Sequence, residues 1–264
     1  MKNTILFTLL LFCLASCSQN KKIAGRSPMR TELRSVGTFS RITYSGDGEV
    51  TIVKSDVFKV EVSDYENLLP YLETEVTESD KLKIEYRAGM TIRNTKLKVT
   101  IHMPMTTEVV LRGNGKISLS IQNATPGKLN LSVLGDGTIS SGAVKTADLS
   151  VNIGGNGRIS ILDADAERAV CTIKGDGDIQ IQNGNISTSD FSINGNAKID
   201  MCKVSAKKAV MEMTGDGIIT SRVSDSVTAS IIGNAIIYVV GKPEINEKKM
   251  VGNGKIKKLE TCSQ

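Results

Sequence analysis

A triplet of glycine, then Asp or Asn, then glycine or alanine returns along most of this chain at nearly constant intervals. The first glycines of successive triplets stand at positions 113, 135, 155, 175, 195, 215, 233 and 252. A fixed period of about 20 residues is typical of a solenoid, in which equal segments of chain stack on one another, and not of an ordinary globular core. The middle residues of the triplets are Asn114, Asp136, Asn156, Asp176, Asn196, Asp216, Asn234 and Asn253.

Apolar residues recur at fixed places around each triplet. In the first seven triplets the positions two and four before the first glycine and four after it are apolar, and small polar residues mostly lie between them. An interval of two residues is the period of a β-strand and not that of a helix. The position four after the glycine is isoleucine in the first seven triplets: Ile117, Ile139, Ile159, Ile179, Ile199, Ile219 and Ile237.

Each unit is therefore expected to be a strand, a tight corner, a second strand and a short return. Glycine, Asn and Asp tolerate positive φ, which suits them to the corner. A hairpin there would give an antiparallel meander, whereas a corner between stacked coils would give a β-helix. The in-register apolar columns favour the second arrangement. We predict an all-β chain folded as a right-handed parallel β-helix with about 20 residues per coil.

No Asp follows another Asp in the column of middle residues. If that column stacks with one residue per coil, neighbouring carboxylates would lie about 5 Å apart and repel each other. An amide between two carboxylates removes this contact and can donate a hydrogen bond to both. We interpret the column as a structural turn ladder with an electrostatic reason for its alternation. Free interchange of two turn-forming residues, or a coil of twice the length with two corners, would also produce it.

The start of the chain has the features of an export signal. Lys2 is followed by an apolar run, residues 5–14, that is too short to span a bilayer. The sequence Leu-Ala-Ser-Cys at 14–17 resembles the lipobox of bacterial lipoproteins. The resemblance implies a signal peptide at 1–16, acyl chains on Cys17 and a membrane as partner through that anchor. We therefore expect an outer-membrane lipoprotein on the periplasmic face or at the cell surface.

The rest of the chain divides into three parts by its pattern. Residues 17–32 are polar and are expected to form a tether. Residues 33–105 alternate less regularly and are expected to be an irregular β region of wider coils that caps one end, although 39–52 fit the coil template. Residues 106–264 are expected to be the regular β-helix. Solenoids need caps because open sheet ends pair with other chains.

Three cysteines remain after the signal peptide and Cys17. Cys171 falls on an inward column and is expected to be a small buried hydrophobe. Cys202 and Cys262 lie far apart in the sequence, so a bond between them would have to span several coils, and the sequence does not predict this disulfide. The chain has no C-x-x-C pair, which disfavours a zinc or redox site.

No residue pattern indicates catalysis. His102, the only histidine, has no accompanying Ser or Cys motif, and Asp163 and Asp165 share a loop without partners in the next coil. Gly-Asp-Gly differs from calcium-binding nonapeptide repeats because Asn separates the carboxylates. The net charge of +5 comes without aromatic residues among the basic ones, which argues against nucleic acid as a partner. We predict no catalytic residue, cofactor or metal.

Several motifs together resemble one family. After the lipobox come Phe39-x-x-Ile42-x-x-x-Gly46, then residues 66–70, then 97–104, then the repeated triplets. This order resembles the bacterial head GIN domain family, labelled as auto-transporter adhesins, over about residues 33–260. The resemblance implies a β-helix-like fold and supplies no catalytic residue. We expect a non-enzymatic envelope protein that binds a glycan or an envelope protein. A carbohydrate-active enzyme and a scaffold component of an envelope complex are the alternatives.

Overall fold

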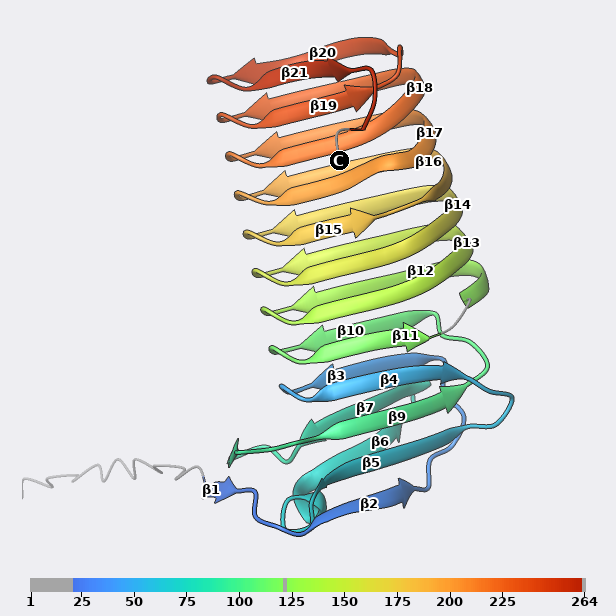
Figure 1. Cartoon of the computed structure of the whole chain (residues 1–264), viewed down its shortest axis with the longest axis vertical. Coiled ribbons are helices and arrows are strands. Elements are labelled where there is room, and N and C mark those ends of the chain that lie inside the picture. Colours follow the sequence, from blue (N-terminus) through green and yellow to red (C-terminus); the bar gives the residue numbers. More distant parts are fainter. Residues whose placement is uncertain (1–20, 121–122, 263–264) are drawn as a thin grey trace, which may run out of the picture.

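Each repeat of the sequence becomes one coil of a right-handed parallel β-helix (Figure 1). The computed structural model describes residues 21–120 and 123–262. One strand runs toward the Gly-Asx-Gly triplet, the chain turns there, a second strand runs back, and a bend on the opposite side leads up to the next coil. The predicted fold class and the coil length of about 20 residues are confirmed, which excludes a coil of twice that length.

The regular coils contain twelve strands, several of which continue through the bend. They are β10 (Glu108–Arg112), β11 (Lys116–Ser120), β12 (Asn123–Leu134), β13 (Thr138–Gly154), β14 (Arg158–Lys174), β15 (Asp178–Ile181), β16 (Gly184–Asn194), β17 (Lys198–Thr214), β18 (Ile218–Ile232), β19 (Ile236–Val240), β20 (Glu244–Val251) and β21 (Lys255–Leu259).

The apolar columns of the sequence form the core. Ile159 pairs with Ile179, and Ile179 pairs with Ile199, in parallel register. All three are fully buried. Completely burying one such side chain contributes about 1.5–3 kcal/mol. A single coil would leave these side chains in water, because the residues that cover them belong to the neighbouring coils. Each coil is therefore stabilised by the coils above and below it.

The N-terminal region contains nine strands and one short helix. They are β1 (Lys21–Ala24), β2 (Met29–Arg34), β3 (Arg41–Ser45), β4 (Glu49–Lys54), β5 (Lys59–Tyr65), the 3-10 helix η1 (Leu69–Tyr71), β6 (Leu72–Thr77), β7 (Lys81–Tyr86), β8 (Met90–Arg93) and β9 (Lys98–Met103).

One coil of the regular stack comes from this region. β3 pairs with β10 and β4 pairs with β11, both in parallel, so the turn at 46–48 lies directly beneath the turn at 113–115. The chain between β4 and β10 is an insertion that builds most of the cap below this coil and then returns to the regular coils. Inward-facing Ile42, Tyr44, Val50 and Ile52 are buried as the coil template predicts.

The cap is not made of wider coils, as the sequence suggested. β7 and β9 continue the stack in parallel below β3 and β4. Beyond them the pairing becomes antiparallel, with β5 joining β9 to β2 and with β6 beside β7 (Figure 1). Only β6 and β7 are consecutive strands joined by a short turn, whereas β2, β5 and β9 come from distant parts of the chain.

A buried carboxylate holds the cap together. Asp64 is fully buried, and its Oδ1 accepts hydrogen bonds from the backbone N–H groups of Tyr65 at 2.7 Å and Lys96 at 2.9 Å. Its Oδ2 accepts from the hydroxyls of Tyr86 and Thr95. Burial, and then the hydrogen bond to Asp64, raises the pKa of Tyr86. With four donors around it, the buried charge fixes β5 against residues 95–96.

The prediction that residues 17–32 form a tether is wrong for most of residues 21–32, the part of this segment that the structure describes. β1 pairs in parallel with β8, and β2 pairs antiparallel with β5. The polar composition hid these strands because they lie at edges, where few of their residues need to be buried. None of the described residues belongs to a helix long and apolar enough to cross a membrane.

Candidate functional site on the bend edge

The stack has two long edges of different character. We call the edge formed by the Gly-Asx-Gly triplets the corner edge, and the opposite edge, formed by the connecting bends, the bend edge (Figure 1). At the corner edge the backbones of successive coils lie very close. Gly195 has φ of +140°, and a Cβ atom there would lie 2.0 Å from the carbonyl oxygen of Gly175. Only glycine fits, so this edge leaves little freedom to vary.

The middle residues of the triplets stack along the corner edge as hydrogen-bonded pairs. In one pair, the backbone N–H and the side-chain amide of Asn156 donate to Oδ1 of Asp136 at 3.3 and 3.1 Å. The same two bonds join Asn196 to Asp176. The same pair of bonds joins Asn234 to Asp216, and the side-chain amide of Asn253 donates to Oδ1 of Asn234. It also joins Asn114 to Asp47, a residue that the sequence did not predict as a member of the ladder.

Each Asn–Asp bond of the ladder runs from an Asn to the Asp of the coil below. The expectation that one amide donates to both neighbouring carboxylates is therefore not met among these contacts. Within residues 21–120 and 123–262, no group of three or more His, Cys, Asp and Glu side chains could hold a metal ion. The corner edge thus has the chemistry of a structural ladder, in which carboxylates accept from amides and backbone.

The bend edge changes length partway along the stack. Asn196 follows Asp176 by 20 positions, whereas Asn234 follows Asp216 by only 18. The pairing of β17 with β18 loses register at the bend, between Met201 and Ser205 and again between Ala206 and Lys208. The missing residues are therefore taken from the bend, so residues 222–226 turn more tightly than residues 202–208 below them.

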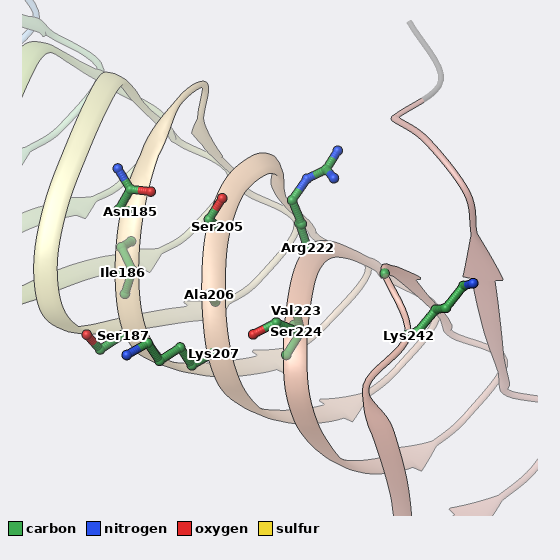
Figure 2. A pocket seen from close by; sticks show the side chains of 11 residues that line it. Asn185, Ile186, Ser187, Ser205, Ala206, Lys207, Arg222, Val223, Ser224 and Lys242 are labelled. Carbon is green, nitrogen blue, oxygen red and sulfur yellow. The ribbon is translucent and has the colours of Figure 1, made fainter.

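This step leaves a hollow on the surface. It has a volume of about 500 Å³ and crosses four consecutive bends, at 185–187, 205–207, 222–224 and 241–242 (Figure 2). We call it the bend groove. Its floor is apolar, because Ile186, Ala206 and Val223 are buried. Asn185, Ser205 and Arg222 occupy one paired column and extend from the same side of the bends.

The rim of the bend groove is cationic. Lys207, Arg222 and Lys242 come from three consecutive bends, and no residue that lines the groove is acidic or aromatic. Among the described residues, none of these three cations forms an ion pair with a carboxylate. Two carboxylates lie beside the groove: Asp165 accepts a hydrogen bond from the Asn185 amide at 3.3 Å, and Asp225 accepts one from the Ser224 hydroxyl at 2.5 Å.

Some cations on the flat faces of the stack form ion pairs. The guanidinium of Arg158 lies 3.3 Å from a carboxylate oxygen of Asp178, and Lys198 lies 3.3 Å from Asp200. These exposed pairs contribute little stability, about 0–1 kcal/mol each, but they cancel charge locally. None of the three rim cations of the bend groove forms such a pair among the described residues.

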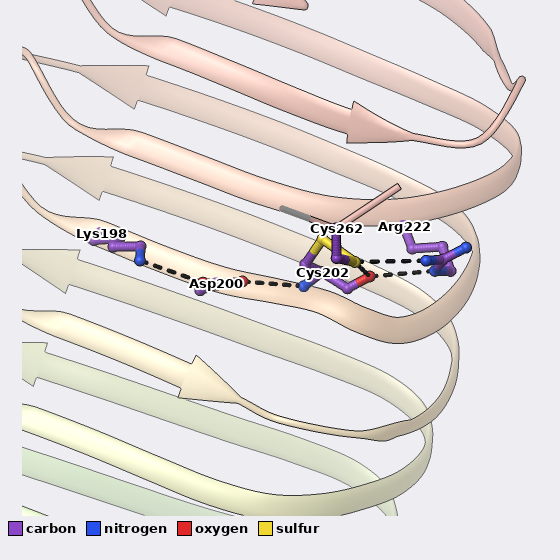
Figure 3. The surroundings of a disulfide bond; sticks show 5 residues. All are labelled: Lys198, Asp200, Cys202, Arg222 and Cys262. Atoms are coloured by element: carbon purple, nitrogen blue, oxygen red, sulfur yellow. Dashed lines mark hydrogen bonds and ion pairs between the residues drawn. A yellow bond between two sulfur atoms is a disulfide. The ribbon is translucent and has the colours of Figure 1, made fainter. Parts of the chain in front are cut away.

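A disulfide lies next to the groove and corrects the expectation from sequence. Cys202 and Cys262 are bonded, with Cα atoms 5.7 Å apart (Figure 3). After β21 the chain turns back along the stack (Figure 1). The tail itself therefore crosses the coils that separate β21 from Cys202. The Arg222 guanidinium donates to the carbonyl oxygen of Cys202 at 3.2 Å and contacts Sγ of Cys262 at 3.5 Å. The disulfide therefore holds Arg222 at the rim.

The other residues singled out from the sequence lie apart from one another. Cys171 is buried as expected, and burial raises the pKa of its thiol to about 12. His102 lies on β9 with Nε2 4.0 Å from Glu61, far in the fold from Asp163 and Asp165 on a bend of β14. The lipidation site Cys17 and the signal peptide lie outside the described residues.

The sequence contained one signal for the groove. The triplets that begin at Gly215 and Gly233 lie closer together than any other successive pair, which shows that one coil is short. The interval does not show which side of the coil is shortened, and the cations of the rim are not at equivalent positions in the repeat. Both facts depend on how the bends lie beside one another in the fold.

Comparison with known proteins identifies the family. Residues 38–243 match the family described as "Putative auto-transporter adhesin, head GIN domain". The chain belongs to the head GIN domain family. The matched range includes the inserted cap, most of the regular coils and all of the bend groove, so the groove is part of the head GIN domain of this chain. No protein with a curated description matches it.

Solved structures share this fold. A protein from Parabacteroides distasonis ATCC 8503, described as a "Putative lipid binding protein", superposes with a TM-score of 0.83 at 24% identity, covering 91% of this chain and 100% of that chain. A "putative adhesin" from Parabacteroides merdae ATCC 43184 gives 0.84 at 20% identity, with the same coverage. Another from Bacteroides fragilis NCTC 9343 gives 0.67 at 20% identity, covering 90% and 100%. At these identities the likeness is one of fold.

Proposed function

We propose that this head GIN domain protein is a non-enzymatic, lipid-anchored binding module of the bacterial cell envelope, with the bend groove as its ligand site. The observation that carries the proposal is the groove itself, a hollow of about 500 Å³ whose three rim cations have no carboxylate partner among the described residues. Unpaired charge and a preformed concave surface favour binding of a ligand of opposite charge. The family description as an adhesin agrees with a binding role.

The position of the groove suits a protein anchored at its N-terminus. β1 begins four residues after Cys17, so acyl chains on that cysteine would place the cap near the membrane. From β3 to β17 the coils are joined by six successive pairings, through β10, β12, β13, β14 and β16. At about 4.8 Å per step, the groove would stand roughly 30 Å beyond the first coil. The solenoid would act as a stalk that presents the groove away from the bilayer.

An enzyme is the less favoured alternative. Cleavage of a glycosidic bond by the usual mechanism needs two carboxyl groups that face each other across the substrate. The lining of the bend groove contains no carboxylate. A scaffold role in an envelope complex is the second candidate and is supported by the long polar faces of the coils.

Two measurements test the proposal. The purified full chain, screened on a glycan array and used to capture partners from envelope extracts, should retain at least one ligand without modifying it. Capture of nothing in either experiment would contradict a binding role, and release of sugar fragments would favour the enzyme. Protease treatment of intact cells then separates the two locations, because a surface adhesin is degraded and a periplasmic protein is protected.

A further inference from the structure

We propose that the bend groove binds an acidic polysaccharide that lies along the axis of the stack, with a carboxylate or sulfate group at each coil. The inference rests on the proposed function and adds the chemical class of the ligand. It follows from the direction of the groove, the spacing of its cations, the polar groups beside them and the residue types that it lacks.

The groove has the direction and the repeat of an extended polymer. It crosses four bends that belong to successive coils, so its length follows the stack axis. Neighbouring coils are separated by about 4.8 Å, which is roughly the length of one sugar ring in an extended chain. One sugar can therefore face each bend.

The cations have the same repeat. Lys207, Arg222 and Lys242 supply one positive group on each of three successive bends. Arg222 extends from one side of the bends and Lys207 from the other (Figure 2), so a polymer that lies between them with acidic groups on both of its edges would meet the cations in turn, whereas a single small anion could use only one or two. The guanidinium of Arg222 suits a carboxylate or sulfate especially, because it can donate two parallel hydrogen bonds.

The remaining lining favours a sugar over other polyanions. Asn185, Ser187, Ser205 and Ser224 offer donors and acceptors of the kind that sugar hydroxyls need. No aromatic ring lines the groove, so nucleic-acid bases would have nothing on which to stack. A neutral glycan would also lack a stacking platform and would leave the three cations unpaired.

The disulfide restricts the position of Arg222, the central cation, before a ligand binds. Arg222 donates to the carbonyl oxygen of Cys202 at 3.2 Å, so the bonded Cys202–Cys262 pair restricts this side chain before the ligand arrives (Figure 3). A side chain that is already ordered loses less entropy on binding. Affinity should therefore be higher in an oxidising compartment, where this disulfide persists.

The test measures binding of a fluorescent sulfated hexasaccharide and of its desulfated counterpart to the full chain by anisotropy. We expect binding of the sulfated form only, weakening as salt rises. Lys207→Gln and Arg222→Gln should each lower affinity about tenfold, and the triple variant with Lys242→Gln about a hundredfold or more. The affinity of the Arg222→Lys variant should lie between those of the unmodified protein and of Arg222→Gln, because lysine keeps the charge but cannot donate two parallel hydrogen bonds. Lys116→Gln, on a flat face, is the matched control and should bind normally.

The outcomes separate the inference from the proposed function. Equal binding of both hexasaccharides, or unchanged affinity in the triple variant, would overturn the groove assignment while a binding function could stand on another face. Binding to phosphatidylglycerol vesicles through the same three residues, without binding to the sulfated sugar, would overturn the polysaccharide in favour of a lipid headgroup. A chain that binds neither sugar and captures no envelope component would overturn the proposed function as well. Circular dichroism of each variant shows that the fold is intact.

Discussion

At the corner edge every regular coil turns through the same triplet, whereas at the bend edge neither the sequence nor the length of the connection is kept. The corners place backbone against backbone, so that a Cβ at Gly195 would lie 2.0 Å from the coil below. The bends face solvent on one side and can lose residues without breaking the stack, as residues 222–226 show. The comparison teaches that the regular edge specifies the fold and that the irregular edge is free to carry a binding site.

The largest effect is expected at the corner. Gly195→Val should lower the free energy of unfolding by about 3–5 kcal/mol, because a β-branched residue at φ of +140° is strained and its Cβ meets the Gly175 carbonyl. Urea denaturation measures this loss. Ser205→Val, on an exposed position of the bend edge, is the control and should change stability by less than about 0.5 kcal/mol. Similar losses in both variants would contradict the distinction between the edges.

Removing the disulfide should have the next largest effect. Replacing both Cys202 and Cys262 by Ser opens a loop with a sequence separation of 60 and should cost about 2–4 kcal/mol. Because coils contact only their neighbours, the loss should appear as faster hydrogen exchange in β18 to β21 and little change in the cap. Treatment of the unmodified protein with a reductant should produce the same increase in hydrogen exchange. Uniform loss of protection across the whole stack would argue against this local role.

A smaller effect is expected in the turn ladder. Asn156→Asp places three carboxylates in a row with Asp136 and Asp176, which should cost about 1 kcal/mol at neutral pH. Repulsion raises the pKa of the new carboxyl in the folded state, so the penalty is absent when the group is protonated and grows as pH rises through that pKa. Thermal unfolding at pH 3 to 7 measures it. Asn152→Asp, whose partners are Asn130 and Ser150, should show no such slope; equal slopes would refute the electrostatic reason for the alternation.

The sequence predicted the regular part of the fold because the physical cause is periodic. Isoleucine four residues after each triplet glycine has to meet its counterpart one coil away, and pairs such as Ile159 with Ile179 do so. The cap escaped prediction because its strands pair out of sequence order. Residues 39–52 fit the coil template, but they do not indicate which coil they lie beneath, because the insertion before residues 108–120 interrupts the period.

The candidate site was less predictable for a related reason. The rim cations come from bends of unequal length, so Lys207 and Lys242 hold no common position in the repeat. Counting coils between Cys202 and Cys262 does not predict their disulfide, because the count ignores a tail that reverses direction. The site depends on a shortened bend and a reversed tail, and neither of these features repeats along the chain.

The most direct test restores the period at the bend edge. Inserting two residues between Ser221 and Arg222, where residues 202–204 of β17 have no counterpart in β18, would return the short coil to the length of the coil below it and fill the step that forms the groove. We predict that the free energy of unfolding stays within about 1 kcal/mol of the unmodified protein, while affinity for the sulfated hexasaccharide falls at least tenfold. The same insertion in the bend at 162–168 should leave affinity unchanged. Undiminished binding after the insertion at 221–222 would contradict the claim that the shortened coil creates the site.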